Sequence, residues 1–188
     1  MDFTTQFYIL PWRDILLLLF LATILFSVLH LRFRTRSWWK VIVGLLWLTA
    51  VLGILYITVL KREKGMECQV LLTPFRSWKL FFSGEQQEAF RYNLMNMILF
   101  LPYGFLGFAL LPREWGTGRK LAALALTGCL YSVLVEVLQY RLQCGEAETD
   151  DVIHNTVGAF AGAVLSWAEG QVLVWLRRRK KGKGAYHA

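Results

Sequence analysis

The sequence predicts an all-α, polytopic membrane protein, a helical bundle with about five transmembrane helices. Hydrophobic residues make up 56% of the 188-residue chain. They gather in runs that are about long enough to cross a hydrocarbon core of roughly 30 Å. The 15% share of aromatic residues excludes intrinsic disorder, and three cysteines are too few for a disulfide scaffold.

Three of the five runs are apolar almost throughout, and two carry a few polar residues. The apolar runs are Ile15–Leu31, Val41–Leu60 and Val152–Leu176. The mixed runs are Asn93–Leu111 and Leu121–Tyr140. No internal repeat is apparent in this series. We therefore expect a single transmembrane domain over residues 1–176, followed by a basic tail over residues 177–188.

Lysine and arginine residues give the expected orientation. They follow the first run, lie in the short connection after the third run, and fill the tail; examples are Arg34, Arg113 and Arg178. Because positive charge marks the cytoplasmic side, we expect a multi-pass membrane protein with its N-terminus outside and its C-terminus in the cytoplasm. The tail then follows the last helix on the cytoplasmic side, where anionic lipid headgroups attract it. No motif indicates nucleic-acid binding.

Polar residues lie on one face of three predicted helices. They are Asn93 and Asn96 at the start of the third helix, Ser132, Glu136 and Gln139 in the second half of the fourth, and Asp150, Asp151 and Asn155 at the start of the fifth. With the expected topology, these three helix ends meet at the outer leaflet. Carboxylates in a membrane helix need a partner or a function. We expect Arg91 and Arg141 to be cationic partners, with Arg76 as a third.

Each polar group also has a purely structural interpretation. Asp150 and Asp151 can complement the positive end of the fifth helix. The asparagines can cap a helix or bond between helices, and His154 is interpreted as a boundary residue. Glu136 is the strongest functional candidate, because an acid inside a span requires either a buried partner or a function.

Three further features lie outside these polar groups. Aromatic and basic residues of the long loop, including Phe75, Arg76 and Trp78, suit a membrane interface above the polar cluster, with a short surface helix around Glu85–Phe90. The small-xxx-small pattern at Gly158 and Gly162 predicts close helix packing within the bundle. Cys68 and Cys144 would both be external, which leaves a disulfide between them open.

Motifs between Leu72 and Ala163 resemble the VanZ-like family of bacterial membrane proteins. The matching segments are Leu-Thr-Pro-Phe at 72–75, Asn-Leu-Met-Asn at 93–96 with Phe-Leu-Pro-Tyr-Gly at 100–104, Ser132 with Glu-Val-Leu-Gln at 136–139, and Glu-Thr-Asp-Asp-Val-Ile-His-Asn-Thr-Val-Gly at 148–158. The resemblance implies a link to bacterial resistance against teicoplanin, a lipoglycopeptide that acts outside the cell on peptidoglycan precursors. It implies no reaction, cofactor or oligomeric state.

The first functional hypothesis is an antibiotic-resistance or cell-envelope factor without enzymatic activity. It would bind a membrane lipid, a lipid-linked cell-wall precursor or a lipoglycopeptide in a polar pocket of the outer leaflet. The candidate ligand-binding residues are Phe75, Arg76, Arg91, Asn93, Asn96, Ser132, Glu136, Gln139, Asp150, Asp151 and Asn155.

The second hypothesis is an intramembrane hydrolase or transferase that acts on a lipid or prenyl-linked headgroup. Glu136 and Asp151 would then be the catalytic acid and base. In one version Asp150 and His154 join them around a divalent metal, although the sequence contains no recognised metal-binding motif. A third, structural hypothesis is that the polar cluster only holds three helices together.

Overall fold

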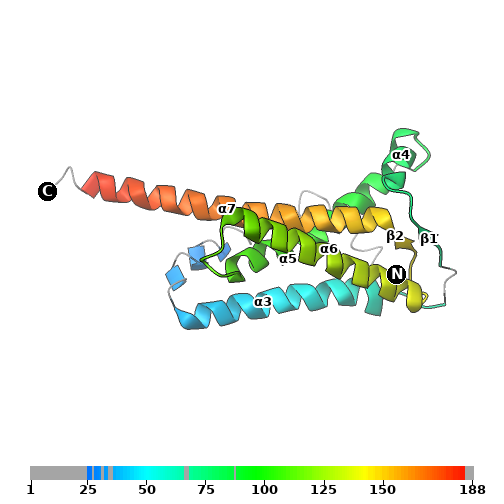
Figure 1. The fold of residues 1–188 in the computed structure, drawn as a ribbon, viewed down its shortest axis with the longest axis horizontal. Coiled ribbons are helices and arrows are strands. Elements are labelled where there is room, and N and C mark those ends of the chain that lie inside the picture. Colours follow the sequence, from blue (N-terminus) through cyan, green and yellow to red (C-terminus); the bar gives the residue numbers. More distant parts are fainter. Residues whose placement is uncertain are drawn as a thin grey trace. The chain divides into compact units, whose positions relative to one another are not determined.

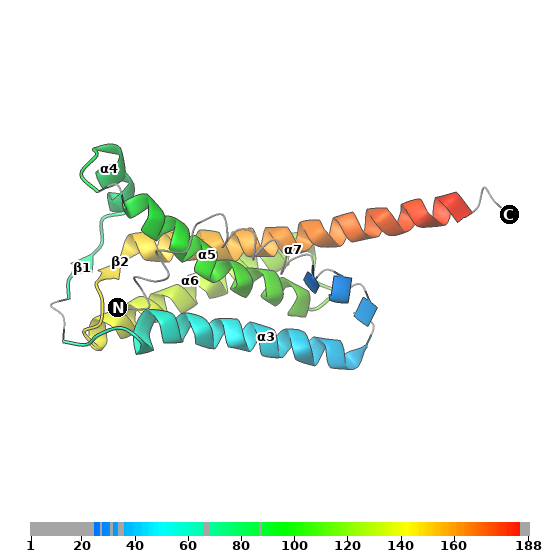
Figure 2. The same ribbon diagram turned by 180° about the vertical axis from the view of Figure 1, so that it is seen from behind.

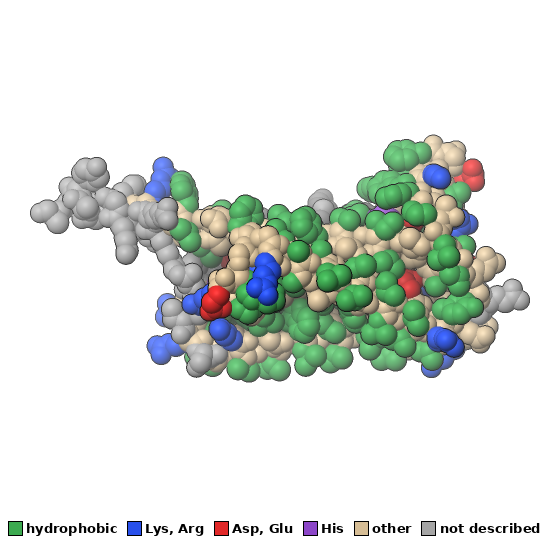
Figure 3. Space-filling model, viewed as in Figure 1, with side chains coloured by type: hydrophobic (Ala, Val, Ile, Leu, Met, Phe, Trp, Pro, Cys, Tyr) green, Lys and Arg blue, Asp and Glu red, His purple; other side chains and the backbone are tan. Residues whose placement is uncertain are grey.

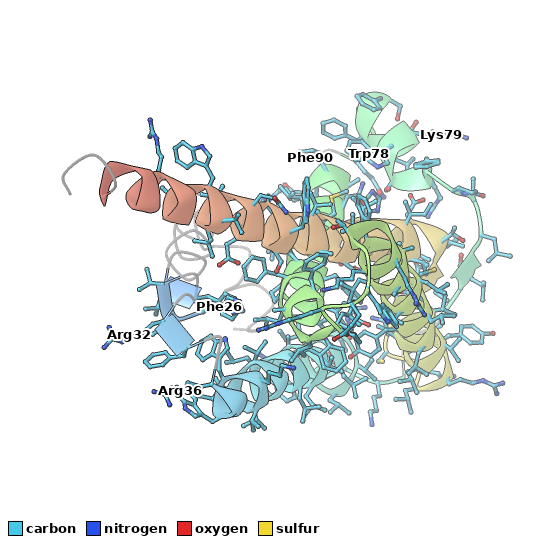
Figure 4. All side chains as sticks on the ribbon, turned by 60° about the vertical axis from the view of Figure 1, so that its left-hand side comes forward. Phe26, Arg32, Arg36, Trp78, Lys79 and Phe90 are labelled. Carbon is cyan, nitrogen blue, oxygen red and sulfur yellow. The ribbon has the colours of Figure 1, made fainter. Side chains whose placement is uncertain are left out.

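The computed structural model describes residues 25–26, 28–30, 32–33, 36–65, 68–86 and 88–184. The first predicted span therefore lies largely outside the described residues. The chain divides into two compact units, Met1–Val41 and Ile42–Ala188. In the first unit, the indole Nε1 of Trp39 donates a hydrogen bond of 3.0 Å to Nδ1 of His30, and the rings of Phe26 and Phe33 pack around them. Figure 4 labels Phe26 in this unit.

The described elements are almost all helical (Figure 1). In chain order they are α3 (Ser37–Leu55), the π-helical turn η1 (Tyr56–Leu60), strand β1 (Val70–Leu71), α4 (Arg76–Phe82), α5 (Ala89–Leu110), α6 (Thr117–Arg141), strand β2 (Ala147–Glu148) and α7 (Thr149–Gly184). Four segments are long and apolar enough to cross a membrane: Trp38–Leu60, Ala89–Leu110, Thr117–Arg141 and Thr149–Leu176. The predicted all-α membrane bundle is confirmed for the described part of the chain.

Element boundaries differ from the sequence expectation in two places. The short surface helix lies at Arg76–Phe82 rather than around Glu85–Phe90, because a carboxylate from α7 satisfies its N-terminus, as described below. Helix α7 starts at Thr149 and continues through the basic segment to Gly184. The segment expected to be a tail thus extends the last helix.

Helices α5 and α7 pack backbone against backbone through glycines. A Cβ atom on Gly158 would lie 2.2 Å from the carbonyl oxygen of Met97, and one on Gly162 would lie 2.0 Å from that of Leu101. The contact is reciprocal, since a Cβ on Gly104 of α5 would lie 1.8 Å from the carbonyl oxygen of Ala159. The predicted use of the small-xxx-small pattern within the bundle is confirmed, and Figure 2 shows the two helices side by side.

The core between α3, α5 and α6 is built from aromatic residues. Phe100 is fully buried and packs against Tyr103 and Tyr131. Trp47 donates from Nε1 to the carbonyl of Tyr103 at 3.1 Å, and the Tyr131 hydroxyl donates to the carbonyl of Val51 at 2.6 Å. These bonds satisfy the polar ends of large rings inside an apolar core.

The outer surface of the helices is apolar, as lipid contact requires. Leu45, Leu126 and Leu165 are among the exposed hydrophobic residues. Figure 3 shows hydrophobic side chains covering most of the visible face of the helices. The polar groups of interest are instead at one end of the second unit.

Candidate functional site

Four segments of the chain meet at this end of the second unit. They are the end of η1, the start of α5, the end of α6, and β2 with the start of α7. The loop segments are tied together by a short parallel pairing of β1 with β2, in which Val70 faces Ala147 and Leu71 faces Glu148. Figures 1 and 2 show α4, β1, β2 and the start of α7 at this end.

Asp150 of α7 caps the N-terminus of α4. Its carboxylate accepts hydrogen bonds from the backbone N–H of Phe75 at 2.5 Å, from the N–H of Ser77 at 2.7 Å, and from the Ser77 hydroxyl at 2.5 Å. The first turn of any helix has N–H groups without an internal partner, and Phe75 lies just before α4 in a left-handed conformation with φ of 58°. A carboxylate 73 residues later in the chain thus takes the place of a local cap.

Two more hydrogen bonds fix α4 to the bundle. Asn93 of α5 donates from Nδ2 to the Ser77 hydroxyl at 3.0 Å. Trp78 donates from Nε1 to Nε2 of His154 at 2.8 Å, and Figure 4 shows Trp78 beside Phe90 of α5. We call these five residues, Ser77, Trp78, Asn93, Asp150 and His154, the α4 clasp.

His154 is buried and engaged by protein groups on both ring nitrogens. Nε2 accepts from Trp78, so in the neutral ring Nδ1 carries the proton and donates to the carbonyl of Asp150 at 2.6 Å. Neither nitrogen offers a lone pair to a metal. Among the described residues, no group of three or more His, Cys, Asp or Glu side chains is placed to hold a metal ion. The metal version of the enzyme hypothesis, with His154 as a ligand, is therefore wrong for this arrangement.

A second polar group lies beside the clasp and contains three carboxyl groups. We call Glu136 of α6, Glu148 of β2 and Asp151 of α7 the acid cluster. Glu136 accepts a hydrogen bond at 3.0 Å from the backbone N–H of Glu148, and Asp151 accepts one at 2.7 Å from Nδ2 of Asn96. Asp151 is close enough to repel both glutamates. Three carboxyl groups from separate elements therefore share one site.

Glu148 is the member of the acid cluster outside the membrane-spanning helices. Burial raises its pKa to about 7, with further contributions in the same direction from Asp151 and Glu146. Arg76 opposes the shift by attracting the carboxylate.

Two buried amide oxygens beside the cluster lack a hydrogen-bond donor. Asn155 donates from Nδ2 to the Ser132 hydroxyl at 2.8 Å, and Gln139 donates from Nε2 to the carbonyl of Thr58 at 3.0 Å. Their side-chain oxygens, Oδ1 and Oε1, are buried and accept no hydrogen bond from any residue that the structure describes. The side chains are only 4% and 2% exposed. We call these two oxygens the open acceptors.

The cations are placed differently from the expectation. Arg91 pairs at 3.0 Å with Glu88, the residue just before α5, and its expected partnership with the interior acids stays a prediction. Arg141 is exposed. Arg76 is also exposed and attracts Glu148, a carboxyl group outside the expected set. The cation that acts on both Glu136 and Asp151 is Arg62.

The candidate residues thus fall into different environments. Asn93 and Asp150 belong to the α4 clasp, whereas Asn96, Ser132, Glu136, Gln139, Asp151 and Asn155 lie in or beside the acid cluster. Phe75 is exposed at the start of α4. Phe100, from the Phe-Leu-Pro-Tyr-Gly motif, is fully buried in the core.

Sequence reasoning missed three residues at the site. Ser77, Glu148 and Arg62 were not among its candidates, yet each contacts or acts on residues that were. All three lie in connections that flank apolar runs on the same expected side of the membrane. Their position in these connections is the sequence signal that could have identified them. No disulfide joins Cys68 and Cys144 in the structure.

Comparisons with known proteins agree with the architecture. A family model described as VanZ/LLP1 matches residues 38–174. This range contains the segment 72–163 that carries the resemblance in the sequence and extends beyond it in both directions. No match was found among curated proteins or solved structures.

Proposed function

The chain belongs to the VanZ/LLP1 family, and from this premise we propose that it is a cell-envelope protein that binds a lipid or lipid-linked molecule at the acid cluster. The cluster would open to the outer leaflet of a bacterial cell membrane, as the positive-inside rule predicts. Loss of free lipid-linked precursor, or capture of the lipid part of a lipoglycopeptide, would then alter susceptibility to teicoplanin.

The observation that carries this proposal is the excess of hydrogen-bond acceptors at the cluster. The two open acceptors and the carboxyl groups of the acid cluster lie together at one end of an apolar bundle. Leaving a buried acceptor without a donor costs roughly 1–3 kcal/mol. A ligand that presents hydroxyl, amide or ammonium groups would remove this cost. Sugar and amino headgroups of membrane lipids carry such donors.

The start of α4 supports a ligand that also has a phosphate and an acyl chain. Arg76 and Phe75 are exposed next to the acid cluster. Arginine binds phosphate through two parallel hydrogen bonds, and an exposed phenylalanine at a membrane interface contacts lipid chains.

Teicoplanin susceptibility of cells with and without the protein tests the proposal. We expect cells with the protein to be less susceptible, and the Glu136→Gln and Asp151→Asn variants to lose the effect while reaching the membrane at normal yield. Glu88→Gln is the matched control, because Glu88 is an acid at the same end outside the cluster. Vancomycin, which lacks the lipid tail, controls for lipid dependence. Equal teicoplanin susceptibility in all strains would refute the resistance role.

A second candidate function is hydrolysis or transfer on a lipid or prenyl-linked headgroup. It is favoured by the electrostatic coupling of Asp151 to Glu136, because a coupled pair of carboxyl groups can supply both an acid and a base. Purified protein incubated with labelled lipid mixtures, with and without a chelator, tests this candidate. Turnover that is lost in Glu136→Gln supports it, and absence of turnover across substrates leaves binding as the function.

A further inference from the structure

An arginine outside the helices acts on two members of the acid cluster. Arg62 follows η1, the π-helical turn that closes at Lys61, whose N–H donates to the carbonyl of Tyr56 at 2.9 Å. The residue is exposed at the end of this turn. Its guanidinium group nevertheless reaches back to the buried turn between α6 and β2.

Gly145 provides the space for this guanidinium group. A Cβ atom on Gly145 would lie 2.6 Å from Nη1 of Arg62, inside van der Waals contact. The same position lies 3.6 Å from Cδ of Gln139, which carries one of the open acceptors. Gly145 is not among the described glycines with positive φ, so its backbone does not require glycine. The absence of a side chain matters here only for the room it leaves.

The charges around this position are unbalanced. Carboxyl groups come from three elements: Glu136 from α6, Glu148 from β2, and Asp151 from α7, with Asp150 held in the clasp. Arg62 attracts both Glu136 and Asp151, whereas Arg76 from α4 acts on Glu148. A group of carboxylates away from water requires a counter-charge. Arg62 is the cation that reaches its two membrane-embedded members.

We propose that Arg62 is the positioning counter-ion of Glu136 and Asp151, seated by the side-chain-free space at Gly145. The guanidinium group has five N–H donors, so it can serve two carboxylates together. In this role Arg62 favours the charged forms of Glu136 and Asp151. The assignment does not depend on whether the protein binds a lipid or transforms one.

Labelling with dicyclohexylcarbodiimide tests this assignment without any ligand. This apolar reagent modifies protonated carboxyl groups, so the pH at which labelling of Glu136 and Asp151 is half-maximal reports their protonation. We expect Arg62→Gln to move this midpoint upward by about one pH unit or more, because loss of an opposite charge favours the neutral carboxyl. Peptide mass spectrometry of the full-length protein in lipid nanodiscs identifies the labelled residue.

Three further variants separate charge, position and general damage. Arg62→Lys retains the charge and should keep the midpoint close to that of the wild-type protein. Gly145→Ala retains Arg62 but displaces its flexible end, so the midpoint should move in the same direction as in Arg62→Gln, by a smaller amount. Gly116→Ala is the matched control, since Gly116 also lies in a loop but has no atom within 4 Å of its Cβ position, and it should behave as wild type.

The outcomes decide the proposal even if one variant folds poorly. Size-exclusion chromatography identifies folded samples, and Gly145→Ala moves only the end of a side chain, so it provides the test if Arg62→Gln aggregates. A shift in folded Arg62→Gln or Gly145→Ala, with none in Gly116→Ala, supports the proposal. Unchanged midpoints in folded Arg62→Gln and Gly145→Ala would overturn it, whatever the result for lipid binding.

Discussion

The α4 clasp and the acid cluster contain similar residues but differ in how completely their hydrogen bonds are satisfied. In the clasp, Asp150 accepts three hydrogen bonds and both nitrogens of His154 are engaged. Beside the acid cluster, Asn155 and Gln139 each retain a buried oxygen without a donor in the described structure. Saturated polar groups specify a structure, whereas unsaturated ones leave capacity for a ligand. The comparison separates scaffold from candidate site among residues that look alike in sequence.

Removal of the clasp carboxylate should have the largest effect on stability. Asp150→Ala leaves two backbone N–H groups and the Ser77 hydroxyl without their acceptor, and each buried unsatisfied donor costs roughly 1–3 kcal/mol. We expect the free energy of unfolding in detergent to fall by about 3 kcal/mol. Asp150→Asn keeps one acceptor oxygen and should lose less. Wild-type stability in Asp150→Ala would show that α4 does not depend on this cap.

A smaller loss is expected from the aromatic part of the clasp. Trp78→Phe keeps a ring against Phe81, Phe82 and Phe90 but removes the N–H donor to His154. We expect a loss of about 1 kcal/mol in the free energy of unfolding, the typical net value of one hydrogen bond, measured by thermal denaturation. Phe82→Leu, at an exposed ring of the same helix, is the control and should change stability little.

A substitution in the acid cluster should impair function without lowering stability. Glu136→Gln removes a carboxyl group that Asp151 repels and keeps an oxygen to accept from the N–H of Glu148. We expect the free energy of unfolding to stay within about 0.5 kcal/mol of wild type or to rise, while the teicoplanin effect is lost. A parallel fall in stability and function would instead favour the structural hypothesis for the cluster.

The smallest effect concerns the pH dependence of stability. The pKa of Glu148 is raised to about 7 in the folded protein, so between about pH 4.5 and 7 the folded state binds more protons at this residue than the unfolded state does. Its contribution therefore makes stability decrease as the pH rises through this window. Glu148→Gln should flatten the corresponding part of the pH profile of Tm, whereas Glu88→Gln should leave it unchanged. An identical profile in Glu148→Gln would refute this contribution.

The sequence was sufficient to predict the helical membrane architecture, because apolar runs of membrane length are a strong signal. It also predicted that polar residues of three helices belong to one end of the bundle, since this follows from helix order alone. The glycine pattern at Gly158 and Gly162 gave the α5–α7 contact, because small residues with this spacing allow two backbones to approach closely.

The division of the polar residues could not be predicted in the same way. Asp150 and Asp151 are neighbours in the chain and share helix position and charge, yet one caps α4 and the other joins the acid cluster. Their side chains leave the helix about 100° apart, and only the placement of α4 decides what each contacts. The reach of Arg62 to Gly145 depends likewise on a contact between residues 83 positions apart, which no local pattern encodes.

The distance along the chain between α4 and its cap constrains how the protein is made. Helix α4 has seven residues, too few to be stable alone in water, and the carboxylate that completes its first turn is synthesised 73 residues after Ser77. We therefore expect α4 to form only after Asp150 of α7 is in place. A truncated chain that ends before α7 should lack the helical α4.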